Sequence, residues 1–410
     1  MAKGKTVPAA IEEWPAWVSQ MSLSATAELE QQVERLRSEG VELLSLGLGE
    51  PDFGPSPLIR QAAVDAVLSG FDGYTASGGT AALKDAVRAR MQEVSGVAYE
   101  RSEVMASIGG KHVLFNTMLA LLRAGDEAII PMPYWVSFPE QVKFAGGVPV
   151  CVPTRAETGY KLTPEELEAR LTAKTRLIIL NSPGNPSGAV YTPEELEALA
   201  RLCRQHNLWA VSDEVYAEFN YRPEGHSSIA ALPGMRERTV IVQSLSKGYG
   251  MPGWRLGFAA APAELIARMT MLQSHTTSNP PNLVQQAAIA ALTGPQDGVA
   301  AMRERYRNRR RIALEGAAAI PGFHCLEPEG AFYLWADIRH WIGRRAAGRV
   351  IADAGDLSAL LLELRRVVVM PGTAFGSPHH LRISFAADEI TLRRGLAAIR
   401  DVLTQASPAG

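Results

Sequence analysis

Five short apolar runs recur through the middle of this sequence, and helical segments separate most of them. A short apolar run is typical of a strand that is buried on both faces. Strands that alternate with helices predict a largely parallel sheet with helices on both sides. The runs are Glu127–Pro131, Val148–Val152, Arg176–Leu180, Leu208–Ser212 and Thr239–Gln243.

Polar residues follow three of these predicted strands. Asn185 lies in a loop after the third run, Asp213 directly follows the fourth, and Ser244 and Lys247 follow the fifth. Ligands of parallel sheets bind beyond the carboxyl ends of the strands. We therefore expect these four residues to lie along one edge of the sheet, although the pattern alone does not show that they converge.

Lys247 is the most informative of these residues. The chain has 41 basic residues, of which 33 are arginine and only 8 are lysine. Because arginine supplies the general surface charge, a lysine in a Gly/Ser loop at a strand end calls for a specific reason. Lysine can lose its proton and act as a nucleophile, whereas arginine effectively cannot. We hypothesise that Lys247 forms a Schiff base with an aldehyde cofactor of the pyridoxal type.

A pyridoxal ring needs partners of a defined kind. A carboxylate such as Asp213 can keep the ring nitrogen protonated, which makes the ring an electron sink. Tyr216 and Asn185 are donors of the right type for the ring oxygen, and Trp135 can stack on the ring face. Each residue also has a structural interpretation, for example Asp213 as a helix cap and Trp135 as a core residue.

The cofactor phosphate and the substrate need further partners. A phosphate is held by backbone amides at a helix start together with a fixed cation. Gly109 and Gly110 open a predicted helix, Ser244 offers a hydroxyl, and Arg255 follows Lys247 in the chain. Arg382, in a late predicted strand, is a candidate for a substrate carboxylate. The alternatives are a plain tight turn at the two glycines and a surface ion pair at the arginine.

Composition and charge argue against several other classes of protein. The formal net charge of −2 gives no support for a nucleic-acid or anionic-membrane partner. Cys151, Cys203 and Cys325 stand far apart, so we expect neither a disulfide framework nor a metal site. No run of about 18 apolar residues occurs, and no apolar segment follows Lys3 and Lys5. We therefore expect a cytoplasmic enzyme.

The length predicts two domains. An irregular arm precedes a helix over 24–40, and a long helical stretch over 285–318 contains the basic segment 303–311, interpreted as a solvated face. Strands and helices of a smaller α+β domain follow. The predicted divisions are 1–52 for the arm and part of the small domain, 53–288 for the large domain, and 289–410 for the rest of the small domain.

At this point the motifs resemble a known family. The sequence is similar to the fold-type I, class I aminotransferases that use pyridoxal 5′-phosphate, and within them to the bacterial aspartate and prephenate branch. The resemblance extends from about residue 24 to about residue 403. It rests on LGLGEPDF (46–53), GGKHVLFN (109–116), NSPGNPSG (181–188), VSDEVY (211–216), SLSKGYGMPGWRLG (244–257), EGAFY (329–333) and LRISF (381–385).

The resemblance implies an α/β fold and a defined site. The large domain would hold a mostly parallel seven-stranded sheet, and both ends of the chain would build the small α+β domain. Lys247, Asp213 and Tyr216 would be catalytic, with Lys247 forming the internal aldimine. The cofactor would be bound by Gly109, Gly110, Lys111, Trp135, Asn185, Asp213, Tyr216, Ser244, Lys247 and Arg255, and by Tyr74 of a second subunit in a homodimer. Gly49, Trp135, Asn185, Arg382 and Lys111 would bind substrate.

Two departures from the family bear on the substrate. Ser187 replaces the usual threonine of the asparagine loop but keeps the hydroxyl. Animal-type aspartate enzymes use an arginine near the segment 274–279, and none stands there. The similar bacterial branch uses the lysine of the GGK motif, here Lys111, for the distal carboxylate. A solvated lysine at a helix start is the structural alternative.

The expected reaction moves the amino group of an L-amino acid, aspartate as the first choice, to a 2-oxo acid such as 2-oxoglutarate. Prephenate, aromatic or other amino acids are alternative substrates, and a lyase, synthase or oxidase of the same fold is an alternative reaction. A regulator with this fold would need a DNA-binding domain, for which the arm is too short. A nicotinamide dehydrogenase would need a GxGxxG motif after a strand, which is missing.

Overall fold

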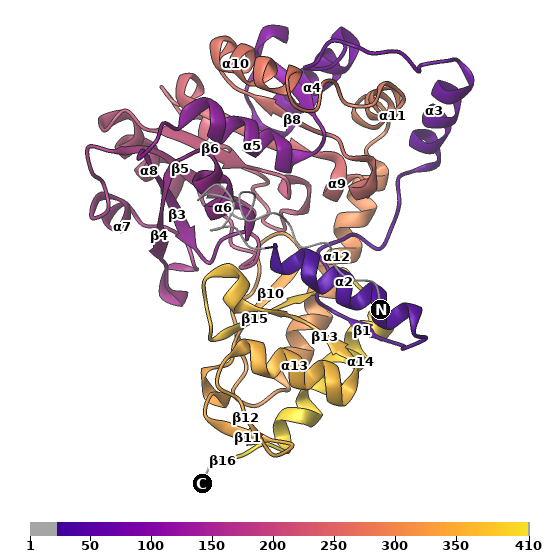
Figure 1. Cartoon of the computed structure of the whole chain (residues 1–410), viewed down its shortest axis with the longest axis vertical. Coiled ribbons are helices and arrows are strands. Elements are labelled where there is room, and N and C mark those ends of the chain that lie inside the picture. Colours follow the sequence, from indigo (N-terminus) through magenta and orange to yellow (C-terminus); the bar gives the residue numbers. More distant parts are fainter. Residues whose placement is uncertain (1–22, 409–410) are drawn as a thin grey trace, which may run out of the picture.

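The computed structural model describes residues 23–408 (Figure 1). The irregular arm predicted over residues 1–22 lies outside the described residues. The described chain forms a large part around a seven-stranded sheet and a smaller part that contains both of its ends. No helix within this range is long and apolar enough to cross a membrane.

The large sheet has the strand order β2-β8-β7-β6-β5-β3-β4. Neighbouring strands from β7 to β4 are parallel, whereas β8 runs antiparallel to both β7 and β2. The mostly parallel seven-stranded sheet is therefore confirmed. The strands are β2 (Val104–Ser107), β3 (Glu127–Met132), β4 (Val148–Pro153), β5 (Thr175–Asn181), β6 (Trp209–Asp213), β7 (Thr239–Ser244) and β8 (Gly257–Ala260).

Alternate residues of the central strands pack on opposite faces of this sheet. Leu177 and Val211 join the hydrophobic cluster under α5 and α10, whereas Ile178 and Ala210 join the cluster under α7 and α8. Helices thus cover both faces, as the continuous apolar runs predicted. The helices of this part are α3 (Pro57–Leu68), α4 (Ala81–Ser95), α5 (Gly110–Leu121), α6 (Ser137–Phe144), α7 (Pro164–Glu168), α8 (Pro193–Gln205), α9 (Leu245–Gly248), α10 (Ala263–Ser274) and α11 (Asn282–Thr293).

The register of the strands brings their carboxyl ends to one level. Asn181 at the end of β5 pairs with Asp213 at the end of β6, and Asp213 pairs with Val242 in β7. The loops that leave β5, β6 and β7 therefore start side by side. This is the edge at which the sequence predicted a ligand.

The smaller part is an α+β unit that joins the two ends of the described chain. Strand β1 (Leu44–Ser45) pairs in parallel with β13 (Val367–Val368), although most of the sequence lies between these two strands. Besides this pair, the smaller part has a four-stranded sheet with the order β14-β15-β10-β9 and a three-stranded sheet with the order β12-β11-β16. Its elements also include α2 (Ala25–Ser38), α12 (Asp297–Ala318), β9 (His324–Cys325), β10 (Tyr333–Asp337), β11 (Arg344–Ala346), β12 (Arg349–Val350), α13 (Ala354–Arg365), β14 (Met370–Pro371), β15 (His380–Ser384), α14 (Glu389–Thr404) and β16 (Ser407–Pro408).

One hydrophobic cluster crosses from the large part into the smaller one. Tyr216 and Phe219 follow β6, and they pack with Tyr306, Phe332 and Tyr333 in a single buried cluster. The domain boundaries near residues 52 and 288 stay predictions. This shared core fixes the smaller part against the open edge of the large sheet, where the site lies.

The helical stretch predicted over 285–318 consists of two helices with a short break between them. Helix α11 ends at Thr293 and α12 begins at Asp297, and Gly294 and Pro295 lie between them. Proline has no amide hydrogen and clashes with the preceding turn, so a helix does not continue through it. The break lets α11 belong to the large part while α12 enters the smaller one.

The basic segment 303–311 is also not a purely solvated face. Arg309 is buried and forms two hydrogen bonds to the carboxylate of Asp52, at 2.8 and 2.7 Å, and a third to the carbonyl of Ala386 at 2.7 Å. A planar guanidinium suits this paired contact with a carboxylate. The arginine therefore ties α12 to Asp52 within the LGLGEPDF motif.

Candidate active site

A cavity of about 310 Å³ lies at the carboxyl edge of the large sheet, where the smaller part meets it. Residues from β6, β7, the start of α5, helix α2 and strand β15 line it. The predicted site residues among its lining are Gly49, Gly110, Lys111, Trp135, Asn185, Asp213, Tyr216, Ser244, Lys247, Arg255 and Arg382. The structure thus brings together Asn185, Asp213, Ser244 and Lys247, for which the strand pattern alone predicted only a shared edge.

Lys247 reaches the cavity from α9, the single helical turn after β7. The hydroxyl of Ser244 caps this turn by accepting a hydrogen bond from the amide of Ser246 at 3.1 Å. The Lys247 ammonium donates to the carbonyl of Gly49 at 2.5 Å. Burial lowers the pKa of Lys247 to about 8, with Arg382 and Arg255 adding to the effect. A lysine near this pKa can be a neutral amine close to physiological pH, as a nucleophile or base requires.

Asp213 is a buried carboxyl group at the end of β6. One of its oxygens accepts a hydrogen bond from the amide of Val215 at 3.2 Å. Burial, with the charge of Glu214 as a smaller cause, raises the pKa of Asp213 to about 7. A buried carboxylate with so little support from the protein is well suited to a cationic partner in the cavity.

The turn before α5 makes an anion-binding cradle. Gly109 has φ 98°, and a Cβ atom at this position would lie 2.6 Å from a guanidinium nitrogen of Arg255. Glycine is therefore required both for the backbone angle and for the approach of the arginine. The first amides of a helix have no intrahelical acceptor, so those of Gly110 and Lys111 are available to an anion. Ser244 lines the same cavity.

Arg382, in strand β15, extends its side chain into the cavity. It is almost completely buried and donates to the side-chain oxygen of Asn185 at 3.0 Å and to the carbonyl of Gly47 at 2.6 Å. Its Nε atom is buried and has no hydrogen-bond partner among residues 23–408. A buried donor without a partner is costly, so this arginine is suited to an anionic ligand.

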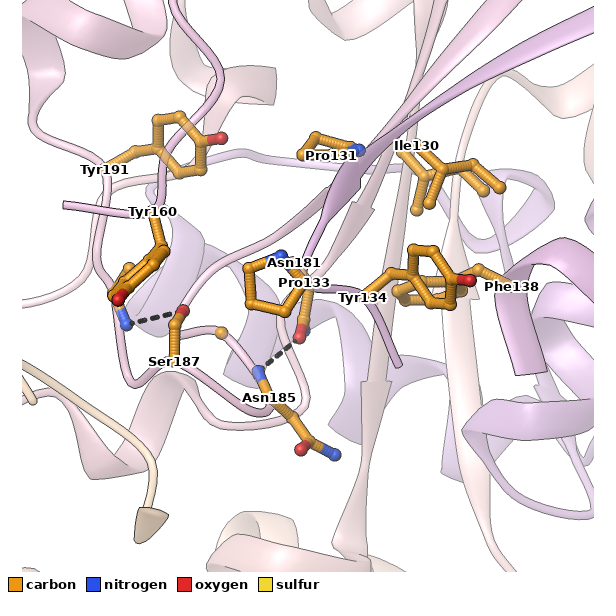
Figure 2. Close-up of a pocket in the computed structure, with 13 residues that line it drawn as sticks. Ile130, Pro131, Pro133, Tyr134, Phe138, Tyr160, Asn181, Asn185, Ser187 and Tyr191 are labelled. Atoms are coloured by element: carbon orange, nitrogen blue, oxygen red, sulfur yellow. Dashed lines mark hydrogen bonds between the residues drawn. The ribbon is translucent and has the colours of Figure 1, made fainter. Parts of the chain in front are cut away.

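The asparagine loop orients Asn185 toward Arg382. The amide of Asn185 donates to the side-chain oxygen of Asn181 at 2.7 Å. Figure 2 shows this bond at the rim of a smaller neighbouring pocket, with the Asn185 side chain turned away from Tyr160 and Pro131. The loop thereby presents the asparagine to the main cavity.

Tyr333 is a site residue that the sequence reasoning missed. Its hydroxyl lies 2.8 Å from that of Tyr216, and the Arg382 guanidinium lies 4.4 Å from the centre of its ring. Tyr333 ends the EGAFY motif, which was noted without a role for the tyrosine. The motif was the available signal, but only the folded chain shows that β10 brings this ring between Tyr216 and Arg382.

Lys111 and Trp135 form the outer wall. The ammonium of Lys111 lies 5.2 Å from the centre of the Trp135 ring, which is within the range of a cation–π contact. Burial and the charge of Arg255 lower the pKa of Lys111, and Glu30 opposes this. Besides Lys247 and Arg255, the cavity therefore has cationic groups at two further places, Lys111 at the rim and Arg382 deep inside.

Tyr74 does not join the cavity of its own chain. Its side chain is 93% exposed, and it is not among the residues that line the cavity. It follows α3, which carries further exposed apolar side chains on the outside of the molecule. Within the described part of the chain no group of three or more His, Cys, Asp or Glu side chains could hold a metal ion.

These features fit a phosphorylated pyridoxal cofactor. The cradle at Gly109 can hold a phosphate, the amine of Lys247 can hold an aldehyde, and the carboxyl group of Asp213 can pair with a ring nitrogen. A lysine after one parallel strand and a carboxylate after its neighbour, on the edge of a seven-stranded sheet, define the class of fold-type I pyridoxal-phosphate enzymes.

Comparison with known proteins identifies the family. The model of "Aminotransferase class I and II" matches residues 41–399. The chain is 43% identical to an aspartate aminotransferase of Geobacillus stearothermophilus, over 90% of this chain and 93% of the relative. It is 41% identical to an aspartate/prephenate aminotransferase of Cereibacter sphaeroides, over 92% and 95% of the two chains. The crystal structure of the Rhizobium meliloti aspartate aminotransferase superposes with a TM-score of 0.92 at 38% identity, covering 96% of this chain and 100% of the other.

The chain belongs to the class I and II aminotransferase family. It is a pyridoxal-phosphate-dependent transaminase, which moves an amino group between an amino acid and a 2-oxo acid. The resemblance drawn from the sequence motifs is therefore confirmed, and so is the α/β fold.

Proposed function

We propose that this enzyme transfers the amino group of L-aspartate to 2-oxoglutarate. The observation that carries the proposal is the pair of cationic groups, Lys111 and Arg382, that line one cavity with Lys247. A dicarboxylic substrate presents two anions, and each would find a cation. The names of similar proteins, aspartate aminotransferases among them, support the same substrate.

Each residue has a proposed role in holding the cofactor. Gly109, Gly110, the Lys111 amide, Ser244 and Arg255 hold the phosphate. Asp213 faces the ring nitrogen, Asn185 and Tyr216 face the ring oxygen, and Trp135 covers the ring. Pyridoxal phosphate, when bound, supplies an electron sink for the electrons of a broken bond at the substrate Cα.

The protein itself would carry out the proton transfers and orient the substrate. The Lys247 amine would accept the proton that leaves the substrate Cα, and as an ammonium it would donate this proton again later in the reaction. Its lowered pKa leaves part of the amine free to accept that proton near pH 8. Arg382 and Asn185, with Gly49, hold the α-carboxylate, and this fixes which bond at Cα is presented to Lys247.

We infer that a second copy of the chain completes the site. Tyr74 is remote from its own cavity, and exposed apolar side chains lie on α3 before it, among them Leu58, Val67 and Leu68. An exposed apolar patch of this kind supports a protein interface. In such a homodimer Tyr74 of one subunit binds the phosphate in the other. We also propose a cytoplasmic location. The three cysteines, all free thiols, are consistent with a reducing compartment.

Substitution of Lys111 tests the substrate assignment. Lys111→Ala should raise KM for aspartate about tenfold more than KM for alanine, because only aspartate loses a charged partner. Steady-state kinetics with 2-oxoglutarate fixed measures both values. Lys174→Ala, which removes an exposed lysine elsewhere, is the control. Equal increases for the two amino acids would contradict a role at the distal carboxylate.

Prephenate is a second candidate for the amino acceptor, as the name of the Cereibacter sphaeroides relative supports, and an aromatic amino acid is an alternative donor. A panel of 2-oxo acids with aspartate fixed tests the acceptor, and a panel of amino acids with 2-oxoglutarate fixed tests the donor. Release of ammonia in place of a 2-oxo acid would indicate a lyase.

A further inference from the structure

Helix α2 brings an acidic group to the mouth of the cavity that the proposed reaction does not use. Thr26 and Glu30 both line the cavity, one helical turn apart on the same face of α2. Leu29 fixes the rotation of the helix, because it packs with the buried cluster around Trp335. Glu28, two residues before Glu30, points to the opposite side of the helix and does not line the cavity.

Glu30 faces into the cavity without a partner of its own. Its carboxylate makes no hydrogen bond or ion pair with any residue between 23 and 408. Its charge nevertheless acts on two groups inside, since it partly opposes the lowering of the pKa that burial causes at both Lys111 and Lys247. The carboxylate therefore shares the outer part of the cavity with the Lys111 ammonium.

The Glu30 carboxylate and the Lys111 ammonium would therefore both lie near the distal end of a bound substrate. Lys111 attracts a distal carboxylate, and Glu30 repels it. A substrate with an uncharged side chain meets neither effect. The balance between the two groups, and not Lys111 alone, then decides how strongly the site prefers a dicarboxylic ligand.

We propose that Glu30 is a specificity-determining residue that weakens the binding of dicarboxylic ligands relative to ligands with uncharged side chains. This inference rests on the proposed role of Lys111. An acidic substrate is then accepted, but it is favoured less strongly than Lys111 alone would allow.

The size of the effect follows from Coulomb's law. Two unit charges separated by a solvent-lined cavity change a binding constant by a factor of about three. Salt screens such an interaction, with a Debye length of about 10 Å at 0.1 M. The effect of Glu30 should therefore shrink as the ionic strength rises.

The test compares two ligands that differ only at the distal end. Succinate carries a carboxylate where butyrate carries a methyl group. Calorimetric titration of the holoenzyme at pH 7 gives both Kd values. Glu30→Gln should lower Kd for succinate about threefold and leave Kd for butyrate unchanged, and Glu30→Lys should lower the succinate value about tenfold. Glu28→Gln on the same helix should change neither.

Several outcomes would overturn the proposal. They are an unchanged succinate Kd in Glu30→Gln, an equal change for both ligands, or the same change in Glu28→Gln. Lys111→Ala in the same assay separates this failure from that of the proposed function. If only Lys111→Ala weakens succinate, the role of Glu30 fails and that of Lys111 stands. If Lys111→Ala affects both ligands equally, the distal role of Lys111 fails.

Discussion

At the scale of single residues, the site depends on two groups whose pKa values move toward neutrality from opposite directions. Burial lowers the pKa of Lys247 to about 8 and raises that of Asp213 to about 7. The same loss of solvent disfavours the cation of one and the anion of the other. Such opposed shifts are typical of groups that exchange or hold protons in catalysis.

The raised pKa of Asp213 has a consequence for stability. Without cofactor, the folded chain retains a proton at Asp213 that the unfolded chain has already lost above its ordinary pKa. The stability contribution of this group is therefore complete below about pH 4, and it is lost as the pH rises toward about 7. In the proposed site, cofactor binding would supply a cationic partner to Asp213 and offset this loss of stability.

Replacing Asp213 with Asn tests this linkage. At pH 8 the cofactor-free variant should melt a few degrees above the cofactor-free wild type, because the buried charge is gone, and at pH 5 the difference should be smaller. Its affinity for pyridoxal phosphate should fall at least about tenfold. Calorimetric melting at both pH values and cofactor titration measure these effects. A wild type that melts as high as the variant at pH 8 would contradict the raised pKa.

Site residues in the loops that follow strands could be predicted from the sequence. Asp213, Lys247 and Asn185 were singled out because their chemistry is unusual for a strand end, and all three line the cavity. Tyr333 and Glu30 were missed. Their positions depend on how β10 and α2 pack against the large sheet, and no local pattern in the sequence encodes that packing.

At the scale of elements, the short connections from β2 to α5 and from β7 to α9 form the anion cradle. The first connection leaves the amides of Gly110 and Lys111 without an intrahelical acceptor, and the second places the Ser244 hydroxyl at the same cavity. The close approach of Gly257 in β8 to Gly110 holds the two connections together, since a Cβ there would lie 2.3 Å from the Gly110 amide nitrogen.

Replacing Gly109 with Ala should damage the cradle specifically. The new methyl group would displace Arg255, so the dissociation constant for pyridoxal phosphate should rise at least about tenfold. Gly96 provides a control for a positive φ, here 71°, with open space around it. Gly96→Ala should cost about 1 kcal/mol of stability from its left-handed backbone angle, and Gly109→Ala should cost more, because φ 98° with ψ 161° is adopted almost only by glycine; denaturant unfolding measures both. A similar loss of cofactor affinity in Gly96→Ala would show that strain, not the contact with Arg255, is responsible.

Elements with a strong local signal were predicted well, and those shaped by tertiary contacts were not. The reciprocal caps of α7 and α8, at Thr163 with Glu166 and at Thr192 with Glu195, are formed as the sequence indicates. The antiparallel strand β8 was not predicted, because its direction depends on the turn made by the Lys247 loop. The solvated interpretation of 303–311 failed because Asp52, the partner of Arg309, is far away in the sequence.

At the scale of the whole molecule, the two ends of the described chain meet in the smaller part, which closes the open edge of the large sheet (Figure 1). The pairing of β1 with β13 places Gly47 and Gly49 beside β15, which carries Arg382. These residues belong to motifs that the sequence analysis identified, but only the folded structure shows that they lie close together.

The proposed dimer predicts complementation between two defective chains. In a mixed dimer of Lys247→Ala and Tyr74→Ala chains, one site would have both Lys247 and a partner's Tyr74. That site should have the full activity of a wild-type site, whereas Lys247→Ala dimers are inactive and Tyr74→Ala dimers bind the cofactor about tenfold more weakly. Activity of purified, differently tagged mixed dimers at limiting cofactor measures this. No recovery above the Tyr74→Ala level would contradict a role for Tyr74 across the interface.

The central claim is that Lys247 is the residue that binds the cofactor covalently. Borohydride reduction of the cofactor-loaded enzyme, followed by proteolysis and mass spectrometry of the peptides, tests it most directly. Of the eight lysines, only Lys247 should carry the added pyridoxyl phosphate mass, and Lys247→Ala should carry none and lose turnover. The pyridoxyl phosphate mass on Lys111 or another lysine, or retained turnover in Lys247→Ala, would contradict the account.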